Sequence, residues 1–486
     1  MKFALISLQQ NTTDPPLGLA YLSAYLKKYS KNNEIKIIDK EDILENIKNN
    51  NYDLIGISAM TTDFKRANSY AKEIKKISKA KLIIGGVHIT IMPHHLEESE
   101  FDIGIIGEGE KTILELINLF NRDNELTEDN LKNIKGLIFK TKNYMYTTPP
   151  RELITNLDEI PYPDRNSLKM KEIYLLPQIK AGSDNIGIFT TIFTSRGCPY
   201  NCPFCSSSSY WNKKIRFHSA NYVINEIELL YKKYKVEGIH ISDDLFIADK
   251  KRVKEIANKL EENGLNKKIR FSLLLRSNLV DEDLIKDLKK MNVTHVGFGF
   301  ESGSTKILKY LKKNTLTVED HKNAVKLCKK YNFQLSGSFL IGCPNETKED
   351  ILETFNFIEE LNLNQMNVNQ LIPMPKTDIW NYAKEEGLVN DSFEFTIKNL
   401  SDLFVHNYNP SLRLSKEIKE SEFKELFDKI QERIKNKKSN NFSLKLTYLK
   451  YLKNPRFILK LFKRRNRILF LLGIKKKDIE YKTENS

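Results

Sequence analysis

Three cysteines stand within eight residues of this chain, in the segment CPYNCPFC at 198–205. Cys198, Cys202 and Cys205 have the spacing C-x3-C-x2-C. A structural zinc site takes four ligands, and the nearest histidine, His218, lies thirteen residues beyond the third cysteine. Buried free thiols would explain a single cysteine better than three together. Three thiolates suit an iron–sulfur cluster that keeps one iron open to another ligand, which is typical of a reactive site.

The remaining two cysteines, Cys328 and Cys343, are too few to form a disulfide framework in a chain of 486 residues. Clustered thiols of this kind favour metal binding in a reducing compartment. No uninterrupted apolar run reaches the roughly 18–20 residues of a membrane span. The first residues, MKFALISLQQ, predict a strand and not a signal peptide. These features predict a cytoplasmic protein.

The first 135 residues alternate between short apolar runs and helical segments. The runs are KFALISL (2–8), EIKIIDK (34–40), YDLIGISAM (52–60), KLIIGG (81–86) and FDIGIIGEGE (101–110). This alternation predicts an α/β fold with a doubly wound parallel sheet of the Rossmann or flavodoxin type. Three of the runs end in small residues, at 58–59, 85–86 and 107–109. Glycines there either simply end strands or let a ligand approach the backbone; three together favour a ligand site.

A second alternation follows a proline-rich linker predicted over 136–185. Six strand–helix units between 186 and 400 predict a partial (β/α)6 barrel of the TIM type, with its chemistry on the loops after the strands. Singly, a polar residue on such a loop is more often solvated or capping, but several together favour a binding site. The polar residues on these loops are Asp243, Asp244, Arg276, Glu301 and Ser302.

At this point the chain resembles a known superfamily. CPYNCPFC is similar to the cluster loop of the radical S-adenosylmethionine (SAM) enzymes, which also follows the first barrel strand. The resemblance implies a [4Fe-4S] cluster on the three cysteines, with SAM on the open iron. Reduction by an external electron donor would then yield a 5′-deoxyadenosyl radical. The segments ISDDLF, LLLRSN, GFGFESGS and SFLIGCPNET resemble further parts of that barrel. They imply SAM contacts at Phe204, Ser242, Asp243, Asp244, Arg276, Glu301, Ser302, Gly342 and Pro344.

Two residues depart from the pattern of that superfamily. Asn345 and Lys376 stand where glycine is usual. The local geometry of those two loops is therefore left open by the sequence.

The N-terminal domain resembles the cobalamin-binding domain that precedes the barrel in one branch of the superfamily. The similar segments are PPLGLAYLSAYL, IGISAMT, IGGVHIT and IGEGE. They imply cobalamin contacts at Pro16, Leu17, Gly18, Ser58, Ala59, Thr61, Gly85, Gly86, His88, Thr90, Gly107, Glu108, Gly109 and Glu110. A D-x-H-x-x-G segment is absent from the sequence, so cobalamin is expected to bind without a histidine below the cobalt. We interpret His88 as shaping its loop.

The two implied cofactors predict a cobalamin-dependent radical methyltransferase acting on an unreactive carbon. A substrate radical would take the methyl group from cobalt, and a second SAM would remethylate it. Cyclisation, ring contraction or rearrangement without methyl transfer stays open, as does a catalytically inactive scaffold or sensor, although the intact cysteine triad argues against the latter. A methylthiotransferase would carry a second N-terminal cluster, and residues 1–197 contain no cysteine. The expected substrate is a small molecule, a lipid or a peptide, and nucleic acid is not expected.

Two features remain outside this prediction. Cys343, beside the glycine of the fifth barrel strand, is either a small buried apolar residue or a radical quencher or acid. The region 401–486 is expected to be helical and basic: residues 431–486 hold 17 Lys and Arg against 4 Asp and Glu, or +13 of the total +15. Its segment 456–477 suits either a cap over the barrel or contact with an anionic membrane surface or another polyanion.

Overall fold

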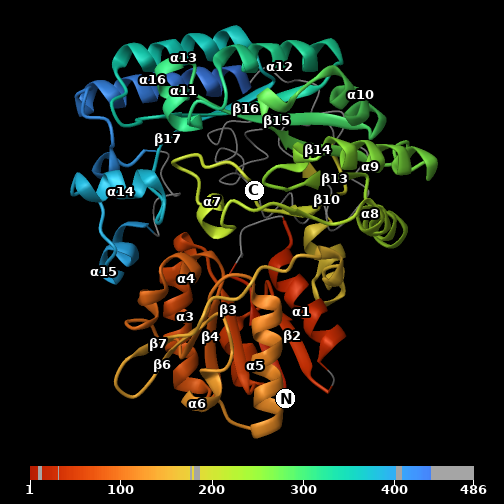
Figure 1. Cartoon of the computed structure of the whole chain (residues 1–486), viewed down its shortest axis with the longest axis vertical. Helices are drawn as coiled ribbons and strands as arrows, with labels where there is room; N and C mark the ends of the chain where they lie inside the picture. Colours follow the sequence, from red (N-terminus) through yellow and green to blue (C-terminus); the bar gives the residue numbers. More distant parts are fainter. Residues whose placement is uncertain (9–13, 31, 176–177, 180–185, 401–407, 439–486) are drawn as a thin grey trace, which may run out of the picture.

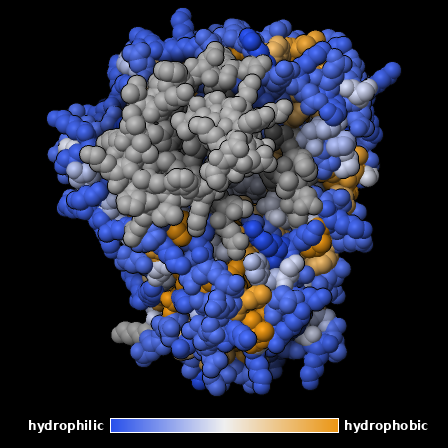
Figure 2. Space-filling model, turned by 180° about the vertical axis from the view of Figure 1, so that it is seen from behind, coloured by the Kyte–Doolittle hydropathy of each residue, from blue (hydrophilic) through white to orange (hydrophobic). Residues whose placement is uncertain are grey.

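The computed structural model describes residues 1–8, 14–30, 32–175, 178–179, 186–400 and 408–438. Two α/β units lie one above the other along the longest axis of the molecule (Figure 1). No helix in these ranges is long and apolar enough to cross a membrane. Hydrophilic residues predominate on the described surface seen in Figure 2, and hydrophobic ones form small patches. The predicted cap or membrane segment at 456–477 lies outside the described residues.

The N-terminal unit is built on a sheet with the strand order β2-β1-β3-β4-β5-β6-β7. Its five parallel strands are β1 (Lys2–Ile6), β2 (Glu34–Ile38), β3 (Leu54–Ser58), β4 (Lys81–Gly85) and β5 (Ile103–Ile105). Strand side chains point alternately to the two faces. One face packs against α1 (Leu17–Tyr29) and α5 (Gly109–Asp123), and the other against α2 (Ile43–Lys48), α3 (Phe64–Ile77) and α4 (Val87–Ile91). The predicted doubly wound sheet is confirmed.

The predicted domain boundary at residue 135 is wrong. Strands β6 (Leu137–Lys140) and β7 (Met145–Thr147) pair antiparallel with β5 and with each other, so they extend the N-terminal sheet. Leu137, Ile138 and Phe139 are all buried. The prolines that indicated a linker begin only at 149. The preceding apolar run joins the sheet because strand pairing satisfies its backbone hydrogen bonds and its apolar side chains are buried.

The second unit is an open parallel sheet in the order β10-β13-β14-β15-β16-β17. The strands are β10 (Phe189–Ile192), β13 (Gly238–Ile241), β14 (Arg270–Leu275), β15 (Val293–Glu301), β16 (Gln334–Ile341) and β17 (Gln365–Gln370). The helices that follow them are α8 (Ala220–Tyr234), α9 (Lys250–Glu262), α10 (Glu282–Lys290), α11 (Thr305–Lys312), α12 (Val318–Lys330), α13 (Lys348–Leu361) and α14 (Asp378–Glu385). This is the partial barrel that the sequence predicts.

Smaller elements complete the barrel. Strand β11 (Ser195–Arg196) pairs antiparallel with β12 (Arg216–Phe217), and between them lie the cysteine segment and the short helix α7 (Ser207–Tyr210). Strands β8 (Gln178–Ile179) and β9 (Ile186–Gly187) form a separate hairpin. Helix α15 (Phe393–Phe395) precedes the C-terminal helix.

The described part of the C-terminal region caps the barrel. Helix α16 (Glu420–Lys438) packs against β17, and Phe423, Phe427 and Ile430 enter the main hydrophobic core. Burying such side chains contributes roughly 1.5–3 kcal/mol each relative to leaving them in water. The beginning of the basic region is therefore an integral part of the fold.

Candidate active site

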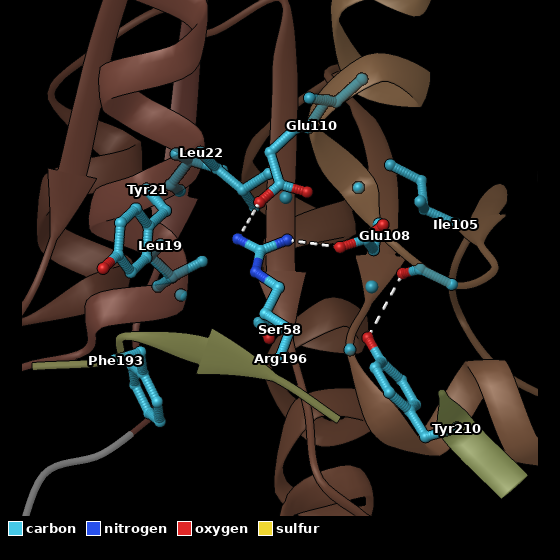
Figure 3. Close-up of a pocket in the computed structure, with 18 of the residues that line it drawn as sticks. Leu19, Tyr21, Leu22, Ser58, Ile105, Glu108, Glu110, Phe193, Arg196 and Tyr210 are labelled. Carbon is cyan, nitrogen blue, oxygen red and sulfur yellow. Dashed lines mark hydrogen bonds and ion pairs between the residues drawn. The ribbon is translucent and has the colours of Figure 1, made fainter. Parts of the chain in front are cut away.

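A cavity of about 320 Å³ lies between the carboxyl ends of the N-terminal strands and the barrel (Figure 3). We call its N-terminal wall the sheet rim; it consists of Ser58, Gly85, Gly86, Gly107, Glu108, Gly109 and Glu110. These residues end or follow β3, β4 and β5, which are neighbours in the sheet. The barrel contributes Phe193, Arg196, Tyr210, Ser242 and Asp244 to the opposite wall. The three strand ends singled out in the sequence thus meet at one cavity, and Gly18 lies on it as well.

The remaining predicted cobalamin contacts lie off this cavity wall. They are Pro16, Leu17, Ala59, Thr61, His88 and Thr90. Leu17 packs against Ile154 and Leu157 of the interdomain connection. Thr90 accepts a hydrogen bond of 3.0 Å from the backbone of Gly107, so it braces the sheet rim from behind.

The ring of His88 is buried beneath the loop that follows β4. Its Nδ1 lies 3.3 Å from Thr61 Oγ1, its Nε2 lies 3.1 Å from His95 Nδ1, and the ring stacks on Phe64 at 3.9 Å. Burial, with the neighbouring His95 adding to it, lowers the pKa of His88 well below its usual value. Both ring nitrogens therefore have partners inside the N-terminal unit.

Gly86 shows why the sheet rim needs glycine. Its φ is +95°, a region that side-chain-bearing residues rarely adopt. A Cβ there would lie 2.8 Å from the backbone oxygen of Ala59 and 2.9 Å from Ser58 Oγ. At Gly18, Gly85 and Gly107 an added Cβ would meet nothing within 4 Å. These three glycines line open space that side chains would otherwise enter, which suits a large ligand lying against the backbone.

Arg196, two residues before the first cysteine of the triad, connects the two walls of the cavity. It donates to Glu108 Oε1 and to Glu110 Oε1, each at 2.6 Å, and Figure 3 shows its guanidinium between the two carboxylates. Arg216 donates to the second oxygen of Glu108 at 2.8 Å. Burial acts to raise the pKa of Glu108, but Arg196 and Arg216 outweigh it and hold that pKa below its usual value. The cysteine segment is thereby tied to the sheet rim by a buried, charged network.

The three cysteines of the triad are each partly exposed, in contrast to Cys328 and Cys343, which are buried. Burial raises the pKa of Cys198 and Cys205, and the neighbouring thiol groups of the segment add to this effect. No three His, Cys, Asp or Glu side chains of the described residues form a group that could hold a single metal ion. Thiolates that hold a cluster bind different irons and need not converge on one point.

We call the polar residues on the barrel loops the barrel rim; they are Ser242, Asp243, Asp244, Arg276, Glu301 and Ser302. The Arg276 guanidinium lies 3.6 Å from the centre of the Tyr200 ring. Glu301 forms a 2.8 Å ion pair with Lys312, and the Lys312 ammonium lies 5.5 Å from the centre of the Phe204 ring.

Two of the predicted SAM contacts on the barrel rim have side chains that are already engaged within the fold. Asp243 accepts hydrogen bonds from the Thr194 amide, the Thr194 hydroxyl and the Ser195 hydroxyl at 2.5–2.7 Å, so it fixes the strand that leads to the cysteines. Ser302 is fully buried and lies 2.9 Å from Thr354 Oγ1. Asp244 is different: it accepts from Ser207 at 2.9 Å and also lines the cavity, beside Ser242.

The loop after β16 is held by Glu346. Its carboxylate accepts hydrogen bonds from the backbone amides of Gly342 and Cys343, and Pro344, the next residue, is buried. Burial raises the pKa of Glu346 to about 8. Cys343 is fully buried in a cluster with Leu371 and Trp380, which supports its interpretation as a small apolar residue over a role as quencher or acid.

The two departures from the usual glycines have a simple structural outcome. Asn345 and Lys376 have φ values of +57° and +59°. Both loops therefore adopt the left-handed backbone that glycine would favour, and asparagine tolerates it better than most residues. The Lys376 ammonium lies 3.4 Å from the backbone oxygen of Thr90 and its carbonyl accepts from Ser209, so this loop reaches the N-terminal unit.

Three functional residues were not predicted: Arg196, Tyr210 and Lys312. Tyr210 donates to the Gly107 carbonyl at 3.3 Å, across the cavity (Figure 3). Arg196 lies two residues before the cysteine segment, and its place so near the first cysteine was the available signal. Lys312 is one of many lysines on helices, and no pattern in the sequence distinguishes it.

Two family models match the chain. A model described as the radical SAM superfamily matches residues 192–358, and one described as a B12-binding domain matches residues 9–117. An uncharacterized methyltransferase of Pyrococcus horikoshii is 36% identical over 388 residues, which are 78% of this chain and 80% of that protein. The chain therefore belongs to the radical SAM superfamily, in the branch that carries an N-terminal B12-binding domain.

Two further similarities bear on function and fold. An anaerobic magnesium-protoporphyrin IX monomethyl ester cyclase of Cereibacter sphaeroides is 26% identical, with 78% of this chain matching 61% of that one. The solved structure of the radical SAM methyltransferase TsrM from Kitasatospora setae, with cobalamin and a [4Fe-4S] cluster bound, superposes with a TM-score of 0.65 at 19% identity. That superposition covers 79% of this chain and 75% of TsrM. At this identity the superposition shows the shared fold.

The residues present fit the cofactors of this family. Three neighbouring, partly exposed thiols are a donor set for a cluster with an open iron. The sheet rim offers exposed backbone and open space at its glycines. On the barrel rim, Nε of Arg276 is buried with no hydrogen-bond partner among the described residues. Buried polar groups without a partner are unusual in folded proteins and mark places where a ligand can complete the bonding.

Proposed function

We propose that this protein is a cobalamin-dependent radical SAM methyltransferase that methylates an unreactive carbon. The observation that carries the proposal is the cavity between the sheet rim and the barrel, whose barrel wall includes Arg196 and Tyr210, the residues that flank the cysteine segment. The similarity to the methyltransferase of Pyrococcus horikoshii supports it. The substrate class remains a small molecule, a lipid or a peptide.

In this proposal Cys198, Cys202 and Cys205 hold the [4Fe-4S] cluster, the barrel rim holds SAM, and the sheet rim holds cobalamin. When bound, these groups supply hydrogen abstraction by a 5′-deoxyadenosyl radical and a transferable methyl group. The chain orients them and excludes water. Arg196 keeps the cysteine segment at a fixed place against Glu108 and Glu110, so the two sites hold their relative position. An external electron donor is needed to reduce the cluster.

The proposal is tested by anaerobic reconstitution with iron, sulfide and cobalamin. We expect about four irons and one cobalamin per chain, and, with a dithionite-type reductant, release of 5′-deoxyadenosine from SAM. Transfer is read by mass spectrometry with methyl-labelled SAM and extracts of the source cells: a product that carries the labelled methyl supports methyl transfer. One zinc per chain in place of iron, or failure to take up cobalamin, would contradict the proposal.

A cyclase or rearrangement activity without methyl transfer is the second candidate. The 26% identity with the protoporphyrin ester cyclase favours it. The same experiment separates the two: 5′-deoxyadenosine and a product without labelled methyl would favour this candidate. A chain that binds both cofactors and releases no 5′-deoxyadenosine would instead be an inactive scaffold.

We also propose that the basic segment 456–477 contacts anionic membrane surfaces, which rests on its composition alone. Flotation with vesicles containing phosphatidylglycerol tests this, with a variant ending at residue 438 as the comparison. Equal flotation of both chains would contradict a membrane contact made by this segment.

A further inference from the structure

The last residue of α11 and the loop that follows it carry two side chains to the barrel rim. Lys312, the last residue of α11, donates to Glu301 Oε1 at 2.8 Å, and the two side chains are only 7% and 10% exposed. Thr315, three residues later, accepts from Arg276 at 2.6 Å. The end of α11 and its loop therefore brace two residues that come from different strands, Arg276 after β14 and Glu301 at the end of β15.

The backbone at Glu301 is held in an unusual conformation. Its φ is +63°, and the register between β15 and β16 shifts between Gly299 and Glu301. A left-handed conformation at a residue with a side chain costs roughly 1–3 kcal/mol and persists only where the surroundings impose it. It folds the carboxylate back over the strand, so that a Cβ on Gly299 would lie 2.5 Å from Glu301 Oε1. The buried ion pair with Lys312 is the interaction that keeps the carboxylate there.

The two cations of this arrangement, Lys312 and Arg276, also reach the cysteine segment. The Lys312 ammonium lies 5.5 Å from the centre of the Phe204 ring, and the Arg276 guanidinium lies 3.6 Å from that of Tyr200. A cation over an aromatic face is attracted to it, more strongly where water is excluded. Lys312 thus lies between Glu301 and the Phe204 ring. Arg276 lies between Thr315 and the Tyr200 ring. The unpartnered Nε of Arg276 leaves one donor for a ligand.

We propose that Lys312 and Thr315 are positioning residues for SAM: Lys312 holds the Glu301 carboxylate, and Thr315 holds the Arg276 guanidinium. This inference rests on the proposed function, since it places SAM at the barrel rim. Neither residue needs to touch SAM. Their effect is that both charged contacts are already ordered before SAM arrives, so less conformational freedom is lost on binding.

The test measures SAM affinity of the reconstituted holoenzyme by equilibrium dialysis with labelled SAM, together with the electron paramagnetic resonance spectrum of the reduced cluster. In Lys312→Met, Glu301 keeps its charge without its partner, and we expect SAM to bind at least tenfold more weakly. The spectrum without SAM should be unchanged, and the SAM-induced change should need a higher SAM concentration. Lys312→Arg should remain within about threefold of the parent. Thr315→Val should lose about three- to tenfold.

Two controls separate positioning from general damage. Lys309→Met removes an exposed lysine from the same helix and should bind SAM as the parent does. Glu301→Gln combined with Lys312→Met leaves no uncompensated buried charge and should fold even where Lys312→Met does not. If Lys312 acts through Glu301, the double variant should bind SAM as weakly as Glu301→Gln alone.

Three outcomes would overturn the inference. They are parent-like affinity in a folded Lys312→Met, a further tenfold loss in the double variant over Glu301→Gln, and parent-like affinity in Thr315→Val. Failure of the SAM site that the proposed function requires looks different, because the parent chain itself would then bind no SAM.

Discussion

The sheet rim and the barrel rim face the same region of the molecule but are constructed differently. On the sheet rim, the absence of side chains leaves space: a side chain at Gly85 or Gly107 would project into the open region. On the barrel rim, charged side chains are present, and others hold them in place, as Lys312 holds Glu301. A site built from backbone is local in sequence, whereas a site built from braced charges depends on residues that the fold brings together.

The largest expected effect tests the chemistry next to the barrel rim. Cys202→Ala removes one of three thiolates and should lower bound iron from about four per chain to near zero, with complete loss of 5′-deoxyadenosine release. Iron analysis and chromatography of the nucleoside measure this. Cys328→Ala, at a buried position on α12 away from the site, should retain its iron. Full iron content in Cys202→Ala would show that the triad does not hold the cluster.

The second effect tests the connection between the rims. Arg196→Met leaves Glu108 and Glu110 buried with one positive partner fewer. Breaking a buried pair from one side typically costs about 3–5 kcal/mol, so the free energy of unfolding in urea should fall by that order. Arg122→Met, whose partner Asp123 is a neighbour on an exposed helix end, should change it very little. Equal stability of Arg196→Met and the parent would mean that the network does not join the two units.

The third test uses pH on the barrel side. Burial raises the pKa of Glu346 from 4.5 to about 8. Between these two values the folded protein binds more protons than the unfolded one, so the free energy of unfolding should fall as pH rises through this window. The stabilisation is complete below about pH 4.5 and lost above about pH 8. Glu346→Gln should flatten this part of the pH profile, whereas Glu349→Gln, exposed on α13, should preserve it. If the free energy of unfolding of Glu346→Gln fell with pH as steeply as that of the parent, the pH dependence would come from another group.

The smallest effect tests the sheet rim. Gly86→Ala forces a side chain into positive φ and within 2.8 Å of a backbone oxygen. We expect cobalamin to bind about tenfold more weakly, or about 1.4 kcal/mol, with iron content unchanged. Gly264→Ala is the matched control, because that residue also has positive φ but open space around it, far from the rim. Spectrophotometric titration with cobalamin measures both. An equal loss of cobalamin affinity in the two variants would mean that backbone strain alone causes the effect.

Much of the fold could be predicted because its causes are local. Apolar runs of strand length alternating with amphipathic helices indicate parallel sheets wherever they occur. Strands β6 and β7 were the exception, because they lie beside a proline-rich segment. They also pair antiparallel, so no helix separates them as it separates the parallel strands. Among the site residues, Gly86 and the cysteines could be predicted from residue type and spacing alone. Asp243 was predicted on the same grounds as Asp244, yet its carboxylate already accepts hydrogen bonds from Thr194 and Ser195.

The sequence by itself determined the cysteine spacing, the glycines at the strand ends and the two runs of alternating elements, because each depends on residue type over a few positions. The tertiary structure alone decided which charges have partners. Arg196 meets Glu108 and Glu110 from 88 and 86 residues away, and Lys312 meets Glu301 only because a bulge and a positive φ turn that carboxylate toward it. Ion pairs act over a few ångströms. Distances of that order exist only once the chain has folded and, for Arg196, once the two units have docked.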